Sequence, residues 1–297
     1  MTPLPAWVHW WPLSNQNLAA EGLFLPAAQG TRYALHHAPA GGAARGVIVF
    51  AHAWAEEMNK SRRMAAMQSR ALAAAGYAVL QIDLQGCGDS SGEFADASWD
   101  GWIADLHLAA HWLSQRYAGA PLTWWGHRAG CLLVCAAAAG LAQPAQLLFW
   151  QPPASGKLLL QQFLRLRAAA EMAGGDAKAA MDSLKQDLAA GRAVDIAGYA
   201  LPSALAQGLE RATLAPPTSP TQAIWLEVTT GDELALLPAS APRIEAWRAA
   251  GHSVDAQAVK GPAFWQTQEI EDAPALIDAT LAALARVRPT APTGLAT

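Results

Sequence analysis

The sequence predicts a single α/β domain, with a mostly parallel central sheet covered by helices on both faces. Short apolar runs of strand length alternate with longer segments of helical periodicity, a pattern typical of parallel sheets. Residues 47–50 are apolar throughout, as expected of a strand buried on both faces. With 297 residues, 53% hydrophobic and 15% charged, the chain can bury a large core and still carry an insertion.

The first half of the chain is expected to open with an antiparallel pair and continue with parallel strands and helices. Gly76 follows a helical segment in the position that ends helices, and Ser98 or Asp100 can cap the next helix. The last helix of this half, 129–141, is apolar all round and is therefore expected inside the fold. The strands are expected at 22–27, 32–37, 47–50, 78–83 and 122–125, and the helices at 60–75, 100–117 and 129–141.

The second half is expected to complete the sheet after an insertion. Residues 151–220 contain helical pieces and a proline-rich exit, which predicts a helical cap over the carboxyl edge of the sheet. Residues 20–150 and 221–287 then form the core, and the Pro/Thr/Gly-rich tail 288–297 is expected to fray. The remaining strands are expected at 147–150, 224–228 and 254–259, and the helices at 243–251 and 269–286.

Composition excludes several classes of function. The net charge of −4, with mixed signs, gives no basic surface for nucleic acid. The amino terminus lacks a secretory signal pattern, and the longest apolar stretch, 131–142, is too short to span a bilayer, so a cytoplasmic protein is expected. Cys131 and Cys135 are expected to be buried reduced thiols. No phosphate-binding loop, dinucleotide motif or metal-ligand spacing is present, so no cofactor is expected.

The most informative motif is Gly126-His127-Arg128-Ala129-Gly130, between an expected strand and an expected helix. It has the form of the G-x-S-x-G nucleophile elbow of α/β-hydrolases, with Arg128 in place of the serine. The flanking glycines suit a turn too tight for Cβ atoms. A guanidinium is not a nucleophile and stays protonated at physiological pH. The motif therefore predicts hydrolase geometry without the usual hydrolase chemistry.

The other members of a Ser-acid-His triad are only partly represented. The acid is expected after the strand that follows the insertion, where Asp232 lies. The histidine is expected after the last strand, but residues 261–266 contain none, and His252 precedes that strand. An ordinary serine esterase mechanism is therefore excluded.

Two backbone N–H groups are candidates for an oxyanion hole. Trp54 follows the first buried strand and Ala129 follows Arg128, the positions that supply the two donors in this kind of site. The alternative is that both segments are simply tight turns. The side chains of Trp54 and Trp265 are expected either in the core or along an apolar or sugar-binding pocket.

The charge-dense run 55–63 offers a partner for Arg128. A guanidinium in a cleft needs a counter-ion, and Glu56 or Glu57 is the natural one. Whether such a pair is structural or part of a site is left open, and the alternative is a solvated helix start with acidic residues near the helix dipole.

Two further residues near the elbow are candidates for the site, Cys87 and His127. Cys87 lies between two glycines on a loop expected to reach the site, where exposure and the charge of Arg128 are expected to favour its thiolate. A small loop thiol without catalytic function is the alternative, and it is the favoured interpretation because no histidine is placed to assist Cys87. His127 is a candidate for substrate contact, although the residue before the nucleophile position normally points away from the reacting carbonyl.

Several segments together resemble the second type of exosortase A system-associated hydrolase, a bacterial α/β-hydrolase-fold family. The resemblance extends over about residues 20–285. It implies an α/β-hydrolase fold and a link to exosortase protein sorting and exopolysaccharide gene clusters, and it says little about the substrate. The segments that carry it are 55–63, 83–92, 126–130, 149–152, 155–157 and 264–267.

Two functions are the leading hypotheses, and thiol chemistry at Cys87 is a third. In the first, a hydrolase acts on an anionic ester, thioester or saccharide-linked substrate: Arg128 holds its carboxylate or phosphate, and Glu57 or Asp232 activates water. The N–H groups of Trp54 and Ala129 receive the oxyanion. In the second, an inactive protein of the same fold binds an exopolysaccharide precursor or a partner of the sorting system.

Overall fold

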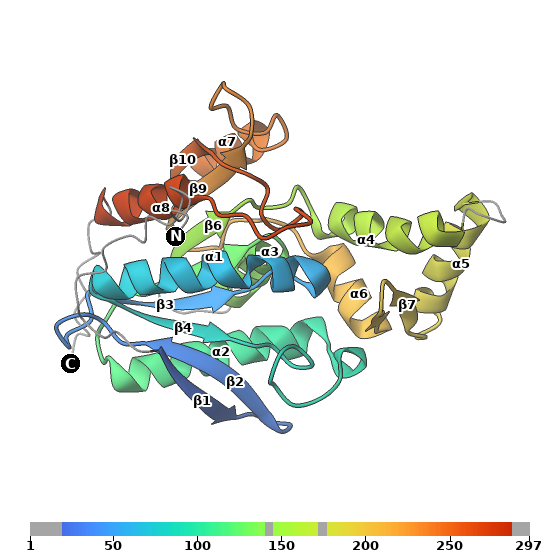
Figure 1. The fold of residues 1–297 in the computed structure, drawn as a ribbon, viewed down its shortest axis with the longest axis horizontal. Helices are drawn as coiled ribbons and strands as arrows, with labels where there is room; N and C mark the ends of the chain where they lie inside the picture. Colours follow the sequence, from blue (N-terminus) through green and yellow to red (C-terminus); the bar gives the residue numbers. More distant parts are fainter. Residues whose placement is uncertain (1–19, 140–144, 172–176, 287–297) are drawn as a thin grey trace, which may run out of the picture.

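An eight-stranded sheet forms the centre of the computed structural model, which describes residues 20–139, 145–171 and 177–286 (Figure 1). The spatial order is β1-β2-β4-β3-β5-β6-β9-β10; β1–β2 and β2–β4 are antiparallel and the other neighbours are parallel. This confirms the predicted class of sheet. The strands are β1 (Ala20–Pro26), β2 (Thr31–His37), β3 (Gly46–Ala51), β4 (Tyr77–Ile82), β5 (Leu122–His127), β6 (Gln146–Trp150), β9 (Gln222–Thr229) and β10 (Ser253–Lys260).

Helices cover both faces of this sheet, as the sequence predicts. One face is covered by α1 (Ala55–Ala74) and α8 (Pro274–Arg286), which also contact each other. The opposite face is covered by α2 (Trp99–Arg116), α3 (Ala129–Ala139) and α7 (Ala241–Ala249). The alternation of side chains along β5 explains why both faces are apolar, since Trp124 belongs to one core and Trp125 to the other.

Two helix starts differ from prediction by five residues each, and α7 lies two residues earlier than predicted. Helix α1 begins at Ala55, five residues before the predicted start, because Glu56 and Glu57 form its first turn, where carboxylates favour the positive end of the helix dipole. Helix α8 begins at Pro274, later than the predicted 269, because proline suits the first helical position. The predicted end of the helix at 141 and the predicted tail 288–297 lie outside the described residues.

The segment between β6 and β9 extends away from the sheet in Figure 1. It contains α4 (Gly156–Glu171), α5 (Ala177–Ala189), α6 (Ser203–Arg211) and a hairpin of β7 (Val194–Ile196) and β8 (Tyr199–Leu201) that the sequence analysis missed. Gly208 of α6 lies directly against Trp99 of α2, so closely that an added Cβ would overlap the indole. This contact fixes α6 to the core.

Most of the described tryptophans, and all three cysteines, lie in the core. Cys131 and Cys135 are buried and free, as predicted. None of the helices in the described part of the chain is long and apolar enough to cross a membrane.

Candidate active site at the β5–α3 turn

The turn between β5 and α3 keeps the backbone geometry of a nucleophile elbow. Arg128 sits in the left-handed region with φ 53°, and its N–H donates to the carbonyl of Trp150 at 3.0 Å. An added Cβ at Gly126 would lie 2.6 Å from the backbone of Cys131, so only glycine fits there. The structure thus supports the reason given for the first glycine of the motif.

The second glycine brings the loop after β3 onto the elbow. An added Cβ at Gly130 would overlap the carbonyl oxygen of Ala51 and lie 2.8 Å from that of His52. The two strands are paired side by side, with Ala51 opposite Gly126. The loop carrying Trp54 therefore lies next to Arg128.

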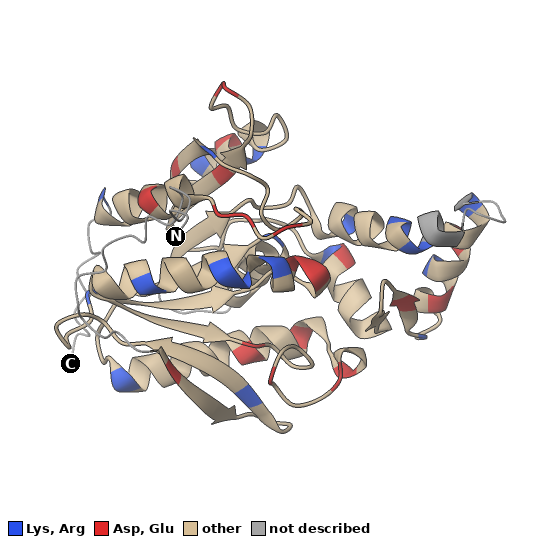
Figure 2. Cartoon of the chain, in the orientation of Figure 1, with Lys and Arg blue, Asp and Glu red and all other residues tan. Residues whose placement is uncertain are grey.

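Arg128 and Glu57 form an ion pair above this turn. Nε of Arg128 lies 3.2 Å from each carboxylate oxygen of Glu57, and Nη2 lies 2.9 Å from Oε1. Both side chains are mostly buried, 12% and 19% exposed. Of the two predicted partners, the structure places Glu57 on Arg128. Figure 2 shows acidic and basic residues adjoining at this end of α1, in a chain where charges are otherwise sparse.

Trp265 completes the surroundings of the guanidinium. The Cζ atom of Arg128 lies 5.6 Å from the centre of the Trp265 ring, within the range of a cation–π contact. Trp265 is on the loop after β10 and is 5% exposed. An acidic and an aromatic side chain from opposite ends of the sequence thus hold Arg128.

Backbone strain concentrates around the same site. Ala55, Arg128 and Gln151 follow three neighbouring strands, and all three have positive φ, at 49°, 53° and 47°. Such conformations cost about 1–3 kcal/mol for a non-glycine residue and cluster at functional sites. Gln151 is held by its side chain, which accepts the N–H of Val228 at 2.8 Å.

The two candidate oxyanion donors lie at the starts of two helices. Trp54 is the N-cap of α1 and Ala129 is the first residue of α3. N–H groups at these positions lack intrahelical partners, and neither group has a hydrogen-bond acceptor within the described ranges. Both residues are almost fully buried, 3% and 1% exposed, so the two N–H groups lack a protein acceptor but face little solvent.

Comparison with solved structures identifies the fold. An α/β serine hydrolase without a lid from Xanthomonas campestris superposes with a TM-score of 0.56 at 17% identity, covering 92% of this chain and 97% of its own. Est1E from Butyrivibrio proteoclasticus, with ferulic acid bound, gives 0.60 at 14% identity, with 89% and 98% covered. At these identities the likeness establishes the fold alone. The chain has the α/β-hydrolase fold.

A family model and a third solved structure are also similar to parts of this chain. A family model described as serine aminopeptidase, S33, matches residues 42–172. That segment of the α/β-hydrolase fold contains the loop after β3 and the elbow. A carboxyl esterase from Bacillus coagulans has a TM-score of 0.55 at 16% identity, with 82% and 90% covered. No curated protein matches the sequence.

The loops after β9 and β10 carry two further predicted site residues, Asp232 and Trp265. Asp232 lies on the loop after β9 as predicted, but its side chain is fully exposed and pairs with Lys260 at 2.7 Å. The loop after β10 supplies Trp265 instead of a histidine. The structure brings Arg128, Glu57 and Trp265 together, and it records no contact between Asp232 and any of them.

The two histidines near the elbow are buried. His127 is 1% exposed and stacks on Phe264 with ring centres 5.2 Å apart, and burial lowers its pKa well below the usual range. Its candidate role in substrate contact is not favoured by this position in the core. His52 accepts the N–H of Leu84, while its other ring nitrogen lies 2.6 Å from the carbonyl of Ala53. Both bonds suit the neutral imidazole, and burial lowers its pKa too.

Cys87 is a correction to the sequence analysis. Its side chain is buried rather than exposed, and burial raises the pKa of the thiol to about 12, with a smaller contribution from Asp83. The expectation that Arg128 favours the thiolate is wrong, because desolvation dominates at this position. Cys87 is therefore the small loop thiol of the alternative interpretation.

Tyr199 is a neighbour of the site that the sequence analysis missed. It follows the two-residue turn of the β7–β8 hairpin, and its hydroxyl donates to Glu56 at 3.2 Å and accepts from Asn59 at 3.1 Å. Burial and the Glu56 charge raise its pKa to about 12. Positive φ at Ala197 and Gly198 suits this kind of hairpin turn, and the Ala-Gly-Tyr sequence was the available signal.

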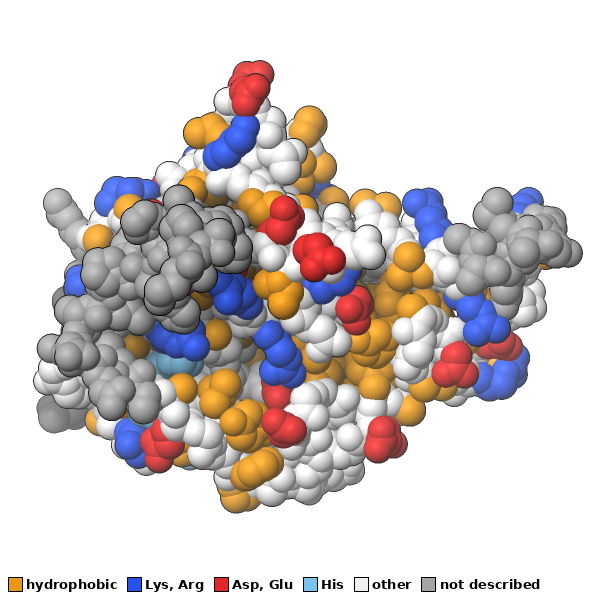
Figure 3. Space-filling model, viewed as in Figure 1, with side chains coloured by type: hydrophobic (Ala, Val, Ile, Leu, Met, Phe, Trp, Pro, Cys, Tyr) orange, Lys and Arg blue, Asp and Glu red, His pale blue; other side chains and the backbone are white. Residues whose placement is uncertain are grey.

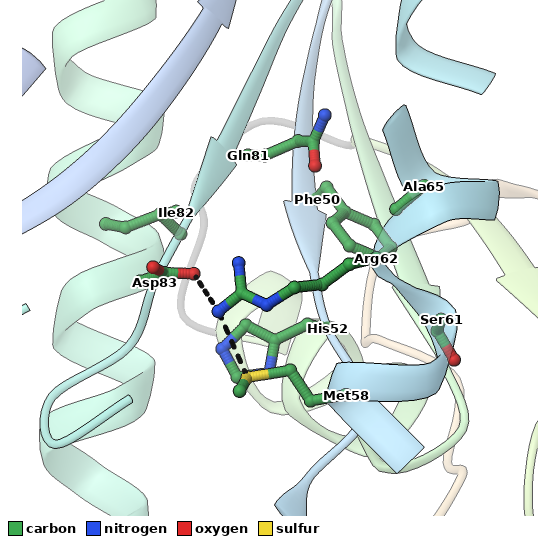
Figure 4. Close-up of a pocket in the computed structure, with 9 residues that line it drawn as sticks. All are labelled: Phe50, His52, Met58, Ser61, Arg62, Ala65, Gln81, Ile82 and Asp83. Carbon is green, nitrogen blue, oxygen red and sulfur yellow. Dashed lines mark hydrogen bonds and ion pairs between the residues drawn. The ribbon is translucent and has the colours of Figure 1, made fainter. Parts of the chain in front are cut away.

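A narrow crevice lies beside the site, between α1 and the ends of β3 and β4 (Figure 4). In Figure 4, Arg62 reaches from α1 toward Asp83, and the two side chains are 3.3 Å apart. The crevice leaves about 20 Å³ free, room for about one water molecule. It is too small for a substrate. The lining residues are Phe50, His52, Met58, Ser61, Arg62, Ala65, Gln81, Ile82 and Asp83.

Proposed function

We propose that the protein hydrolyses an ester or thioester by direct attack of water, without a covalent intermediate on the elbow residue. The observation that carries this proposal is the pairing of Arg128 with Glu57 at the position where the nucleophile of the fold stands. A carboxylate at that position is able to accept a proton from water. The guanidinium holds that carboxylate in place through three N···O contacts.

The chemistry follows from the two donors and the carboxylate. The carbonyl oxygen of the substrate accepts the N–H groups of Trp54 and Ala129, and water adds to the carbonyl carbon while Glu57 takes its proton. The tetrahedral intermediate then breaks its bond to the leaving oxygen or sulfur, which receives the proton from Glu57. Donors of this kind each contribute about 10²- to 10³-fold in rate.

Substrate charge is the second part of the proposal. Arg128 uses Nε and Nη2 for Glu57, and Nη1 is available to a carboxylate or phosphate of the substrate. The carboxyl esterase among the structural neighbours supports an ester substrate, and the charge of Arg128 supports an anionic ester, thioester or saccharide-linked one. Asp232 is the weaker candidate for the base, because its exposed carboxylate is paired with Lys260.

A binding protein without activity is the second candidate. It is favoured by the contacts that already hold Arg128, an ion pair with Glu57 and a cation–π contact with Trp265, and by the absence of a histidine from residues 261–266. On this account the pair is structural, and the fold presents a surface for an exopolysaccharide precursor or a partner protein.

Turnover of p-nitrophenyl esters and acyl thioesters, some carrying a carboxylate, separates the two candidates. The hydrolase account expects turnover above background that falls at least about 100-fold in Arg128→Ala and is unchanged in Asp232→Asn. An inert panel, with ligands that bind but are never converted, would support the binding protein. Loss of turnover only in Asp232→Asn would move the base to the β9 loop.

A further inference from the structure

Trp54 links the proposed oxyanion hole to the insertion. Its backbone N–H is a proposed oxyanion donor, and its indole ring is 3% exposed, covered by Phe163 of α4. The two ring centres are 4.6 Å apart and the planes are tilted by 50°. A group attached to a carbonyl in the hole therefore lies within reach of the indole.

More aromatic rings surround Phe163. Its ring meets Tyr199 edge-on with centres 6.4 Å apart, and Tyr199 meets Phe94 at 5.5 Å. The rings come from the loop after β3, from α4, from the hairpin and from the short helix η1 (Phe94–Asp96). Together Trp54, Phe94, Phe163 and Tyr199 form what we call the aromatic cluster.

The aromatic cluster and the ion pair lie at two ends of one short segment. Trp54 contributes to the cluster, and Glu57, three residues later, holds Arg128. Glu56, between them, accepts the hydroxyl of Tyr199. A ligand spanning this segment meets flat apolar surfaces at one end and a cation at the other.

We propose that the aromatic cluster is the acyl subsite, that it takes an aromatic carboxylic acyl group, and that Phe163 occupies its place in the free protein. The inference rests on the proposed function, since it takes the Trp54 N–H as an oxyanion donor. Replacing one ring by another conserves volume and keeps the edge and face contacts of the cluster. A straight alkyl chain does neither.

Helix α4, which carries Phe163, is partly exposed. Leu158 and Leu166 are 49% and 54% exposed, while other residues of the helix pack against α3, α5, α6 and β7. Figure 3 shows hydrophobic side chains at the surface where the insertion meets the sheet domain.

Calorimetric titration with benzoate and heptanoate tests the class of ligand. The two acids have equal numbers of carbons and equal charge, so attraction to Arg128 cancels in the comparison. Benzoate is expected to bind at least about threefold more tightly, because only a ring stacks on Trp54. Equal affinities, or tighter binding of heptanoate, would overturn the proposal.

Truncation of Phe163 tests whether it stands in for the ligand. In Phe163→Ala, benzoate no longer displaces a ring, and its affinity is expected to rise at least about threefold. Unchanged or weaker binding would show that Phe163 is merely part of the packing. Phe163→Leu replaces the alanine variant if that one does not fold. Phe24→Ala is the matched control, because Phe24 is 58% exposed on β1, and it is expected to change nothing.

These titrations are independent of turnover, so the two proposals fail separately. Preferential benzoate binding in a protein that hydrolyses no ester leaves the subsite standing and removes the hydrolase account. Turnover of esters without preferential binding of benzoate removes the aromatic subsite and leaves the hydrolase account standing.

Discussion

Arg128 and Glu57 are bound to each other through three N···O contacts, the shortest 2.9 Å, although 71 positions separate them in the sequence. The pair joins the elbow to the first turn of α1. Each of these two segments contains one residue with positive φ, Arg128 in the elbow and Ala55 at the start of α1. Because both groups are mostly buried, each depends on the other for charge compensation.

Removing Arg128 is therefore expected to destabilise the fold. Arg128→Ala leaves Glu57 buried without a counter-ion, and the free energy of unfolding is expected to fall by about 3 kcal/mol in urea titrations. Arg63→Ala is the control, since Arg63 pairs with Asp272 at the surface and is 58% exposed. That change is expected to cost less than about 1 kcal/mol. Equal losses in the two variants would contradict the importance of the buried pair.

Any side chain at Gly130, the elbow glycine that contacts the loop after β3, is expected to destabilise the fold. Gly130→Ala places a methyl group on the carbonyl oxygen of Ala51, and backbone does not yield easily, so a loss of about 3 kcal/mol or more is expected. Gly231→Ala is the control, because its new Cβ would lie 3.4 Å from the nearest atom, Thr229 Oγ1. Thermal unfolding of both variants measures the difference, and similar melting temperatures would argue against a tight elbow.

Cys87 is expected to be unreactive in the folded protein. A thiol with a pKa of about 12 carries almost no thiolate at pH 8, and burial blocks the reagent. Intact mass after incubation with iodoacetamide is expected to show no adduct under native conditions, and adducts on all three cysteines in denaturant. Rapid native labelling of Cys87 would restore it as a candidate nucleophile.

Stability is expected to fall at mildly acidic pH, in part because of His37. Burial, and secondarily the charge of Arg70, lower its pKa from 6.5 to about 4 in the folded protein. Gln81 donates to Nε2 of the neutral ring at 3.0 Å. The unfolded chain thus binds more protons between these values, and the free energy of unfolding falls as pH drops from about 6.5 to about 4.

Comparison of the His37→Gln variant with the unchanged protein isolates the contribution of His37 to the pH dependence of stability. His52 and His127 also have lowered pKa values and act in the same direction. His37→Gln is therefore expected to reduce the slope of unfolding free energy against pH, not to abolish it. An unchanged slope in urea titrations at several pH values would show that His37 titrates normally.

The architecture was largely predictable because it depends on local patterns. Apolar runs, the glycine after α1 and the cap at Ser98 each act on their own neighbourhood, and the structure confirms them. The elbow was predictable for the same reason. The start of α1 was predicted five residues late, although one interpretation of the run 55–63, a helix start with acidic residues near the helix dipole, agrees with the structure.

The site was predictable only in part, because its geometry depends on long-range packing. The sequence offered Glu56 and Glu57 equally, and only the fold turns one toward Arg128 and the other toward Tyr199. The burial of Cys87 and the hairpin that delivers Tyr199 likewise follow from elements distant in sequence.

The most direct test of the proposed mechanism is Glu57→Gln, measured for both ester turnover and carboxylate binding. The substitution keeps the size of the side chain but removes the base and the charge that neutralises Arg128. The account predicts that kcat falls at least about 100-fold while benzoate binds as tightly as before or more tightly. Turnover that persists in Glu57→Gln, in a protein with an unchanged melting temperature, would contradict it.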